Sequence, residues 1–301
     1  MIPRIRSALL SGFMAIREKV ARCTNDAERV KLIMAVCDDV TQDADVSIRG
    51  NLRNIVHHFH CLGALRMDDL IQYLQKEGDL DSETMRREEE DGFDEKFGTV
   101  TSPILAQYEL PEQISLERLK TSGRYHPSPI ASVRTALQAL TKYSVRYEDF
   151  TFIDIGSGLG RNLLLAAEYP FRDIIGIEHS AYLHELAESN VSAYAAGGKK
   201  CDKIRLVCGD ALQFNLPSGN LVLYFWRPFT EEMANIFFNR VEAGLAQGRG
   251  RVILVFLGLV YSIVNRSTVF QLLDVFQTGD ILFKDKAHFY ISISSAIYKH
   301  I

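Results

Sequence analysis

A short segment near the middle of the chain constrains the fold most strongly. In Phe152–Arg161, FIDIGSGLGR, an apolar run meets the acidic Asp154 and is followed by glycines at alternate positions. The apolar run before the glycines, and Leu163, Leu164 and Ala167 on one face after them, predict a strand, a tight turn and a helix. Glycine permits positive φ angles and lets a ligand approach the backbone closely. The segment therefore predicts a turn that binds a nucleotide-type ligand.

The spacing of the glycines separates two classes of ligand. A dinucleotide-binding turn has the spacing G-x-G-x-x-G and holds a pyrophosphate at the helix N-terminus. Here Gly156, Gly158 and Gly160 give G-x-G-x-G, and Arg161 occupies the place of the third glycine. A carboxylate at Asp154 repels phosphate and attracts an ammonium group. The pattern favours S-adenosylmethionine, which carries an α-amino group and no phosphate.

Two further acidic residues follow predicted strands. Ile174–Ile177 is apolar and runs into Glu178, 24 residues after Asp154. That interval is close to the roughly 20 residues expected for an acid that binds ribose hydroxyls at the end of the second strand. A third apolar run, Ile204–Cys208, leads to Asp210. Three acids at the ends of successive strands are more specific than a single glycine turn.

The second part of the chain alternates strand and helix patterns. This alternation predicts a doubly wound α/β fold with a parallel sheet. The period-two pattern of Phe289–Lys299 predicts a last, antiparallel strand. The other expected strands are Phe150–Ile155, Ile174–Glu178, Ile204–Cys208, Leu221–Trp226 and Arg251–Leu257, and the expected helices are Ile130–Leu140, Arg161–Glu168, Ala181–Ala195 and Glu231–Ala246.

These residues resemble the cofactor site of class I S-adenosylmethionine-dependent methyltransferases. The resemblance implies a Rossmann-like sheet of seven strands, mostly parallel, with the last strand antiparallel. It also implies contacts of the glycine turn with the methionine moiety, of Glu178 with the ribose and of Asp210 with the adenine. The implied cofactor-binding residues are Asp154, Gly156, Ser157, Gly158, Gly160, Glu178, Asp210 and Ala211.

A narrower resemblance is to a group of largely uncharacterised bacterial methyltransferases, and it covers roughly Phe93 to Ile301. Besides the glycine turn, the matching segments are FDEKFGTVT at Phe93–Thr101, YHPSP at Tyr125–Pro129, PFRDIIGIE at Pro170–Glu178 and YFWRPF at Tyr224–Phe229. YHPSP together with DIGSGLGR is also similar to non-SET protein lysine methyltransferases. That similarity keeps a protein side chain among the candidate acceptors.

Two residues are candidates for positioning the substrate. By the resemblance, Tyr125 contacts the sulfonium or the methionine carboxylate. Arg227 stands where the group usually has asparagine, before Pro228 and Phe229. A guanidinium only donates hydrogen bonds, so it does not accept one from a target amine. It matches a carboxylate or phosphate ester instead, which makes an anionic acceptor a hypothesis.

The first ninety or so residues have no match and contain helical patterns separated by polar breaks, at Ser7–Arg22, Asp26–Asp38, Val46–Leu65 and Asp68–Lys76. We expect a helical N-terminal cap. The highly charged run Asp79–Glu95 is either a linker or a solvated helix face. The predicted domains are residues 1–91, cap and linker, and residues 92–301, the methyltransferase domain.

Composition limits the expected class of substrate and the expected cellular location. A formal charge of −4 and a pI near 6.1 give no global attraction to phosphate backbones, which disfavours a nucleic-acid substrate. Five cysteines without a C-x-x-C pair favour a reducing, cytoplasmic location. No apolar run reaches the roughly 18 residues of a membrane span. His57 and Cys61 would share a helix face, but no second ligand pair lies nearby, so we expect no metal.

These observations together predict a methyltransferase that moves a methyl group from S-adenosylmethionine to a nitrogen or oxygen atom by direct displacement. The expected acceptor is a small molecule or a protein side chain. Two alternatives from other classes stay open at this point. One is a non-catalytic cofactor-binding or scaffold protein with the same fold, and the other is an NAD(P)-dependent oxidoreductase, against which the glycine spacing and Arg161 argue.

Overall fold

The computed structural model describes residues 5–61, 67, 71, 87–88, 91–115, 124–194, 198–248, 250–278 and 286–292. The chain divides into two compact units. The first consists of Met1–Glu90 and Pro103–His126, and the second of Asp91–Ser102 and Pro127–Ile301. The chain therefore passes from one unit to the other three times. The short segment Asp91–Ser102, which precedes the strands in the sequence, belongs to the unit that contains the sheet.

The second unit is built on a seven-stranded sheet in the order β3-β2-β1-β4-β5-β7-β6. Neighbouring strands from β3 to β5 are parallel, whereas β7 is antiparallel to both β5 and β6. The predicted Rossmann-like sheet with an antiparallel last strand is confirmed. The strands are β1 Phe150–Ile155, β2 Asp173–Glu178, β3 Ile204–Cys208, β4 Asn220–Phe225, β5 Val252–Leu257, β6 Phe270–Gln277 and β7 Lys286–Ser292.

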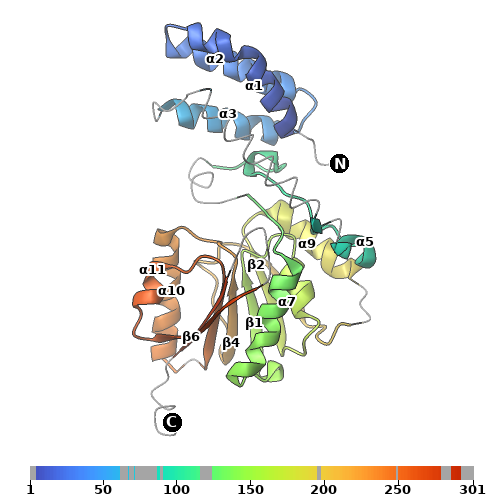
Figure 1. Cartoon of the computed structure of the whole chain (residues 1–301), viewed down its shortest axis with the longest axis vertical. Coiled ribbons are helices and arrows are strands. Elements are labelled where there is room, and N and C mark those ends of the chain that lie inside the picture. Colours follow the sequence, from blue (N-terminus) through green and yellow to red (C-terminus); the bar gives the residue numbers. More distant parts are fainter. Residues whose placement is uncertain are drawn as a thin grey trace. The chain divides into compact units, whose positions relative to one another are not determined.

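Helices cover both faces of this sheet (Figure 1). Helices α7 Ile130–Ala139 and α8 Arg161–Ala166 contribute to one apolar core, while α10 Glu231–Ala246 and α11 Ser262–Arg266 contribute to the other. Because both faces are covered, the central strands are mostly apolar and show no alternation of buried and exposed residues. All six residues of β1 and of β5 are buried.

The helices between the strands agree with the predicted ones, although several end earlier. Helix α9, Ala181–Ala193, begins where Ser180 caps it, since the Ser180 side chain accepts a hydrogen bond from the Leu183 amide. Helix α10 begins in the same way at Thr230, whose side chain accepts from the Met233 amide. These local caps explain why the start of each helix could be predicted from the sequence.

Strand β6 was not predicted, and the predicted start of the last strand, Phe289, is three residues beyond the observed start, Lys286. A bulge between Leu272 and Asp274 shifts the register of β6 against β7, so its residues do not alternate regularly between buried and exposed. The predicted strand Phe289–Lys299 begins at Lys286 in the structure, and its residues after Ser292 lie outside the described part.

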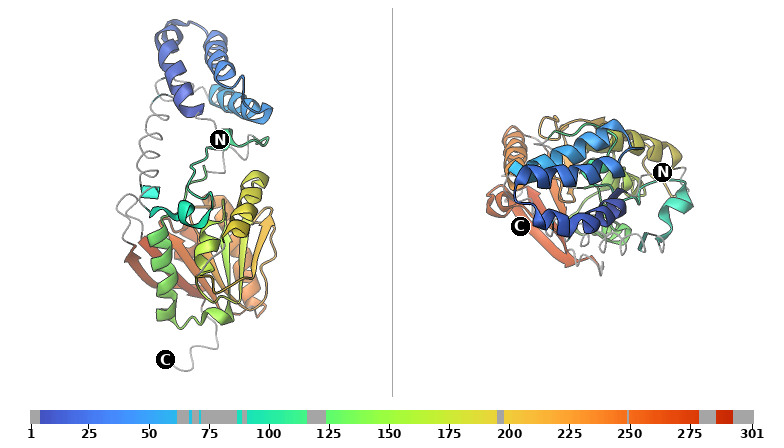
Figure 2. Two further views of the ribbon diagram at one scale, coloured as in Figure 1. Left: turned by 90° about the vertical axis from the view of Figure 1, so that its right-hand side faces the viewer. Right: turned by 90° about the horizontal axis from the view of Figure 1, so that it is seen from above.

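The long α-helices of the first unit pack together (Figure 2): α1 Ile5–Arg22, α2 Asp26–Val40 and α3 Val46–Cys61. Asn51, which is fully buried, joins α3 to the later segment of the unit. Its amide donates to the carbonyl of Glu112 at 2.9 Å, and its carbonyl accepts from the Ile114 amide at 2.9 Å. A buried amide satisfied on both sides fixes the packing of this segment on α3.

Some predicted features fall outside the described residues. All residues but Ile71 of the helix expected at Asp68–Lys76 lie there, as do the last residues of the helix expected at Val46–Leu65 and most of the charged run Asp79–Glu95. At the end of that run, Phe93–Phe97 forms helix α5, between Gly92 and Gly98, both of which have left-handed φ angles.

Candidate functional site

The predicted site residues follow strands whose carboxyl ends lie along one edge of the sheet. Ile155 at the end of β1 pairs with Ile177 of β2 and with Phe225 of β4. Glu178 at the end of β2 pairs with Cys208 of β3. Ligands of open α/β sheets bind outside the carboxyl ends of the strands, where the strand order reverses. In the order β3-β2-β1-β4, that reversal falls between β1 and β4.

The glycine turn has the conformation that the sequence requires. Gly156, Gly158 and Gly160 have φ angles of 77°, 52° and 82°, in the left-handed region that favours glycine. The amides of Gly156 and Ser157 donate to the Ile177 carbonyl at 2.9 and 3.0 Å. The Gly160 amide donates to the Ser157 carbonyl at 2.9 Å. These bonds fasten the turn to the end of β2.

Glu178 is held against the same turn. One carboxylate oxygen accepts from the Gly158 amide at 2.8 Å, and the other accepts from the Ser180 amide at 2.8 Å. The Glu178 carbonyl accepts from the Gly209 amide at 2.8 Å, which joins β2 to the turn after β3. Together with the previous bonds, four amides of the glycine turn donate inside the protein. The turn therefore does not resemble a phosphate cradle, in which such amides point at the ligand.

Asp154 is buried beneath the turn, with 1% of its surface exposed. One carboxyl oxygen accepts from the Asn162 amide nitrogen at 3.1 Å, while the other, Oδ1, has no hydrogen-bond partner. Burial raises the pKa of Asp154 to about 8; the Asn162 hydrogen bond opposes this rise and the charge of Glu178 adds to it. The Oδ1 atom of Asn162 and the hydroxyl of Ser157 are also buried without a partner.

Asp210 and Ala211 lie in the turn after β3 and are half-buried. The Asp210 carboxylate accepts from the Leu212 amide at 2.8 Å and from the Gln213 side-chain amide at 3.3 Å. These bonds form an Asx turn that fixes the carboxylate at the edge of the sheet. The adenine contact implied for Asp210 and Ala211 stays a prediction.

Arg161, at the place of the third glycine, is one of the largest fully buried side chains among the described residues. Its guanidinium donates to the Thr101 hydroxyl at 2.9 Å, the Ser102 hydroxyl at 2.8 Å and the Ser128 carbonyl at 3.2 Å. It also lies 5.8 Å from the centroid of the Phe93 ring, within cation–π range. Arg161 thus fastens two distant segments to the start of α8.

Asp94 organises one of these segments. Its carboxylate accepts from the hydroxyls of Thr99 and Thr101 and from the amides of Thr101 and Ser102, at 2.7 to 2.8 Å. Burial alone raises the pKa of Asp94, but these hydrogen bonds outweigh it and hold the pKa below its ordinary value. The motif FDEKFGTVT therefore builds a rigid strap, Phe93–Ser102, that Arg161 holds.

The strap is fastened a second time by Asn190 of α9. The Asn190 side chain donates to the carbonyls of Val100 and Leu159 at 3.0 and 2.9 Å and accepts from the Val100 amide at 2.7 Å. One buried amide thereby connects the strap, α9 and the glycine turn. Asn162, Arg161 and Asn190 were not among the predicted site residues.

Arg227, two residues beyond the end of β4, has a φ angle of 48° and is exposed. A left-handed conformation is unfavourable for a residue with a Cβ, and the residue before a proline is restricted further. The following Pro228 packs against Gly156, where an added Cβ would approach the Pro228 Cβ to 3.0 Å. Strain of this kind gathers at functional sites because the surrounding structure enforces it.

Tyr261 enforces the conformation of this loop. Its buried hydroxyl accepts from the Phe229 amide at 3.0 Å and donates to the Phe229 carbonyl at 3.2 Å. Burial raises the pKa of Tyr261 to about 12, so the hydroxyl keeps the proton that it donates. No motif marks Tyr261 in the sequence, because its partner is 32 residues away.

Because Arg227 has a left-handed φ angle, Arg227→Gly will be more stable than Arg227→Ala by about 1 kcal/mol. Both variants remove the guanidinium, but only glycine adopts the left-handed φ without a steric penalty. Urea unfolding of the two variants measures the difference. Equal stability, or a more stable alanine variant, would show that the backbone relaxes freely at this position.

Tyr125 belongs to the first unit, and its backbone contacts within that unit are the following. It forms an isolated antiparallel bridge with Leu105: the Leu105 amide donates to the Tyr125 carbonyl at 3.0 Å, and the Tyr125 amide donates to the Leu105 carbonyl at 2.8 Å. Its backbone position is therefore fixed within that unit, and its catalytic role stays a prediction.

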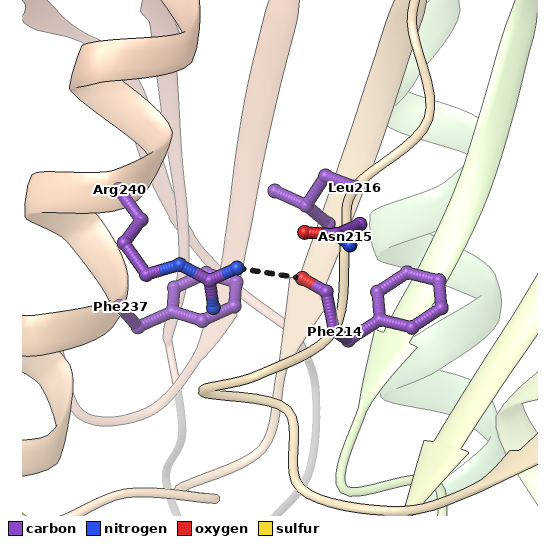
Figure 3. A pocket seen from close by; sticks show the side chains of 5 residues that line it. All are labelled: Phe214, Asn215, Leu216, Phe237 and Arg240. Atoms are coloured by element: carbon purple, nitrogen blue, oxygen red, sulfur yellow. Dashed lines mark hydrogen bonds between the residues drawn. The ribbon is translucent and has the colours of Figure 1, made fainter.

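A small pocket of about 80 Å³ lies between residues 214–216 and helix α10 (Figure 3). Arg240 donates to the Phe214 carbonyl at 3.2 Å across it. The volume suits two or three water molecules, and no predicted site residue lines it.

Within the described part of the chain, no group of three or more His, Cys, Asp or Glu residues is arranged to hold a metal ion, and no helix is long and apolar enough to cross a membrane.

No family model and no curated protein matches the sequence. The class that the strand order defines is the Rossmann-like α/β fold with a seven-stranded sheet. Among solved structures, the chain is similar to magnesium protoporphyrin IX methyltransferase from Synechocystis PCC 6803 with bound SAM, at 13% identity over 55% of this chain and 79% of that one, with a TM-score of 0.42.

The chain is also similar to two other solved structures. The glycopeptide N-methyltransferase MtfA matches at 13% identity over 54% of this chain and 90% of that one, with a TM-score of 0.43. TrmN from Thermus thermophilus matches at 18% identity over 55% of this chain and 52% of that one, with a TM-score of 0.40. At such low identity and TM-scores these matches carry no argument about function, and the fold rests on the strand order and register.

Proposed function

We propose that this protein binds S-adenosylmethionine at the glycine turn and transfers its methyl group to a nitrogen or oxygen atom of a small molecule or a protein side chain. The observation that carries the proposal is the buried Asp154 under the glycine turn, with Glu178 held beside it. The Oδ1 atoms of Asp154 and Asn162 are buried acceptors without a donor. The ammonium group of the cofactor supplies donors of the kind that they lack.

The arrangement fits this cofactor better than a dinucleotide. Four amides of the turn already donate inside the protein, one of them to the Glu178 carboxylate. A diphosphate at the turn would compete with that carboxylate and be repelled by it. The amides of Gly158 and Ser180 orient the Glu178 carboxylate at the end of β2, and a carboxylate there would accept hydrogen bonds from ribose hydroxyls. Asp210 and Ala211 would lie along the adenine.

When bound, the cofactor supplies an electrophilic methyl group on a sulfonium. The acceptor's lone pair forms the new bond to the methyl carbon as the carbon–sulfur bond breaks, S-adenosylhomocysteine leaves, and a protonated acceptor gives its proton to solvent or to a base. The protein's part is to orient the acceptor and to exclude water. We assign acceptor positioning to Arg227, whose exposed guanidinium at the end of β4 suits an anionic acceptor.

Calorimetric titration of the full chain with S-adenosylmethionine, S-adenosylhomocysteine and NADH tests the proposal. We expect both adenosyl ligands to bind and NADH not to bind. In Glu178→Gln, an NH2 group replaces one of the two carboxylate oxygens. This donor then faces the backbone N–H of Gly158 or Ser180, which is also a donor, so the glycine turn is disturbed. Affinity for the adenosyl ligands should therefore fall at least tenfold.

Glu188→Gln is the matched control, because the Glu188 side chain lies on α9 and is 60% exposed. Its affinity should equal that of the wild type. Binding of NADH in preference to the adenosyl ligands would replace the proposal by the oxidoreductase alternative. Adenosyl binding without methyl transfer to any acceptor in a broad screen would favour the non-catalytic alternative.

A further inference from the structure

Asp154 is an unusual carboxyl group in this protein because the described structure gives it so little solvation. It is 1% exposed and accepts one hydrogen bond, from a neutral amide. Its second oxygen has no partner, and two other polar atoms, the Ser157 hydroxyl of the turn and the Asn162 Oδ1 atom of α8, are also buried without partners. An ionised carboxylate is strongly disfavoured in such a site unless a cation or several donors accompany it.

The groups around Asp154 do not supply that cation. On β2, the carboxylate of Glu178 acts as a like charge. On β4, the register partner of Asp154 is Tyr224. On α8, the guanidinium of Arg161 is directed to Thr101, Ser102 and Ser128, and Asn162 donates the single amide bond. The neutral, protonated form of Asp154 is therefore the stable one before a ligand binds.

We propose that cofactor binding at this site is linked to proton release: Asp154 holds a proton in the free protein and loses it when a ligand with a primary ammonium group binds. This inference rests on the proposed function, because the ammonium is that of S-adenosylmethionine or S-adenosylhomocysteine. An ammonium group supplies both the positive charge and the donors that stabilise the carboxylate. The raised pKa of Asp154 agrees with this, since it makes the free carboxyl protonated at pH 6 to 7.

Linkage makes the affinity depend on pH in a defined direction. Between pH 6 and pH 7 the free Asp154 is almost fully protonated, and an α-amino group, with a pKa of about 7.7 to 8.0, is already an ammonium. Binding then releases about one proton, so the dissociation constant of S-adenosylhomocysteine should fall about tenfold from pH 6 to pH 7. A ligand without the amino-acid moiety leaves Asp154 protonated and gives no such dependence.

The test is calorimetric titration of the full chain at pH 6.0 and 7.0, in phosphate and in imidazole, whose different ionisation enthalpies reveal the number of protons released. With S-adenosylhomocysteine we expect a net release of about 0.8 proton for the wild type at pH 7, because the carboxyl loses about 0.9 proton and the unprotonated fraction of the amine takes up about 0.1. With 5′-methylthioadenosine, which lacks the amine, we expect none. The variant Asp154→Asn should bind S-adenosylhomocysteine without proton release and without the tenfold change.

The outcomes separate this inference from the function on which it rests. Binding of S-adenosylhomocysteine without proton release, or equal release in Asp154→Asn, overturns the linkage and leaves the proposed function intact. Absence of binding by all adenosyl ligands overturns the proposed function and the linkage with it. The comparison of two ligands on the wild-type chain keeps the test decisive even if Asp154→Asn does not fold.

Discussion

Asp154→Asn will be more stable than the wild type at pH 8, although it removes a residue of the candidate cofactor site. The pKa of Asp154 in the folded protein is about 8, well above its ordinary value of 3.8, because burial penalises the ionised form. A raised folded pKa means that the unfolded state loses its proton first. The stability contributed by the neutral carboxyl is complete below pH 4 and is lost as the pH rises towards 8.

The difference between the two pKa values corresponds to about 5 kcal/mol at pH 8. Asparagine is neutral at every pH and still accepts the hydrogen bond from Asn162, so it avoids this loss. Thermal unfolding of both proteins from pH 4 to pH 8 should therefore give melting temperatures that diverge as the pH rises, by about 10 °C or more at pH 8.

Asp202→Asn provides a matched control, because its side chain is 88% exposed. That variant should follow the wild type within about 0.5 kcal/mol at every pH. A stability gain for Asp154→Asn that does not depend on pH would assign the effect to packing instead of ionisation. A loss of stability at pH 8 would mean that Asp154 is ionised and well solvated in the free protein.

Much of the second unit could be predicted from the sequence because its signals are local. Buried parallel strands are short apolar runs, and β1 and β3 were predicted with the ends that they have in the structure. Helix α10 also begins and ends as predicted, after a capping threonine. The acids at the strand ends follow from these boundaries, since register alignment brings the ends of parallel strands to one edge.

What could not be predicted depends on contacts between distant residues. Arg161 was recognised only as a departure from the dinucleotide pattern, and its partners Thr101 and Ser128 lie 60 and 33 residues away. The strap was visible as a motif, but its attachment through Asn190 spans 90 residues. Strand β6 was missed for a local reason, because a bulge interrupts its alternation.

The strap also suggests why an arginine replaces the third glycine. In a dinucleotide turn, the third glycine allows close packing of helix and strand. Here the same position starts α8 and sends a buried side chain to residues on both sides of the excursion into the first unit, since Ser102 precedes Pro103 and Ser128 follows Pro127. The exit and the return of the chain are therefore fixed at the base of the glycine turn.

Arg161→Ala should consequently destabilise the protein by about 3 to 5 kcal/mol. The change leaves the acceptors on Ser128, Thr101 and Ser102 without a buried donor and opens a cavity where the guanidinium lay. Arg161→Lys keeps the charge, but a single ammonium cannot match three acceptors arranged for a planar guanidinium. We expect it to lose about 2 kcal/mol in urea unfolding.

Arg146→Ala serves as the control, because the Arg146 side chain is 78% exposed and its ion pair with Asp149 contributes little. It should remain within about 0.5 kcal/mol of the wild type. If Arg161 holds the strap to the glycine turn, Arg161→Lys will also bind S-adenosylhomocysteine more weakly at a temperature where it is fully folded. A loss below 1 kcal/mol for Arg161→Ala would mean that the buried guanidinium does not fasten these segments, and that the contacts of Asn190 suffice.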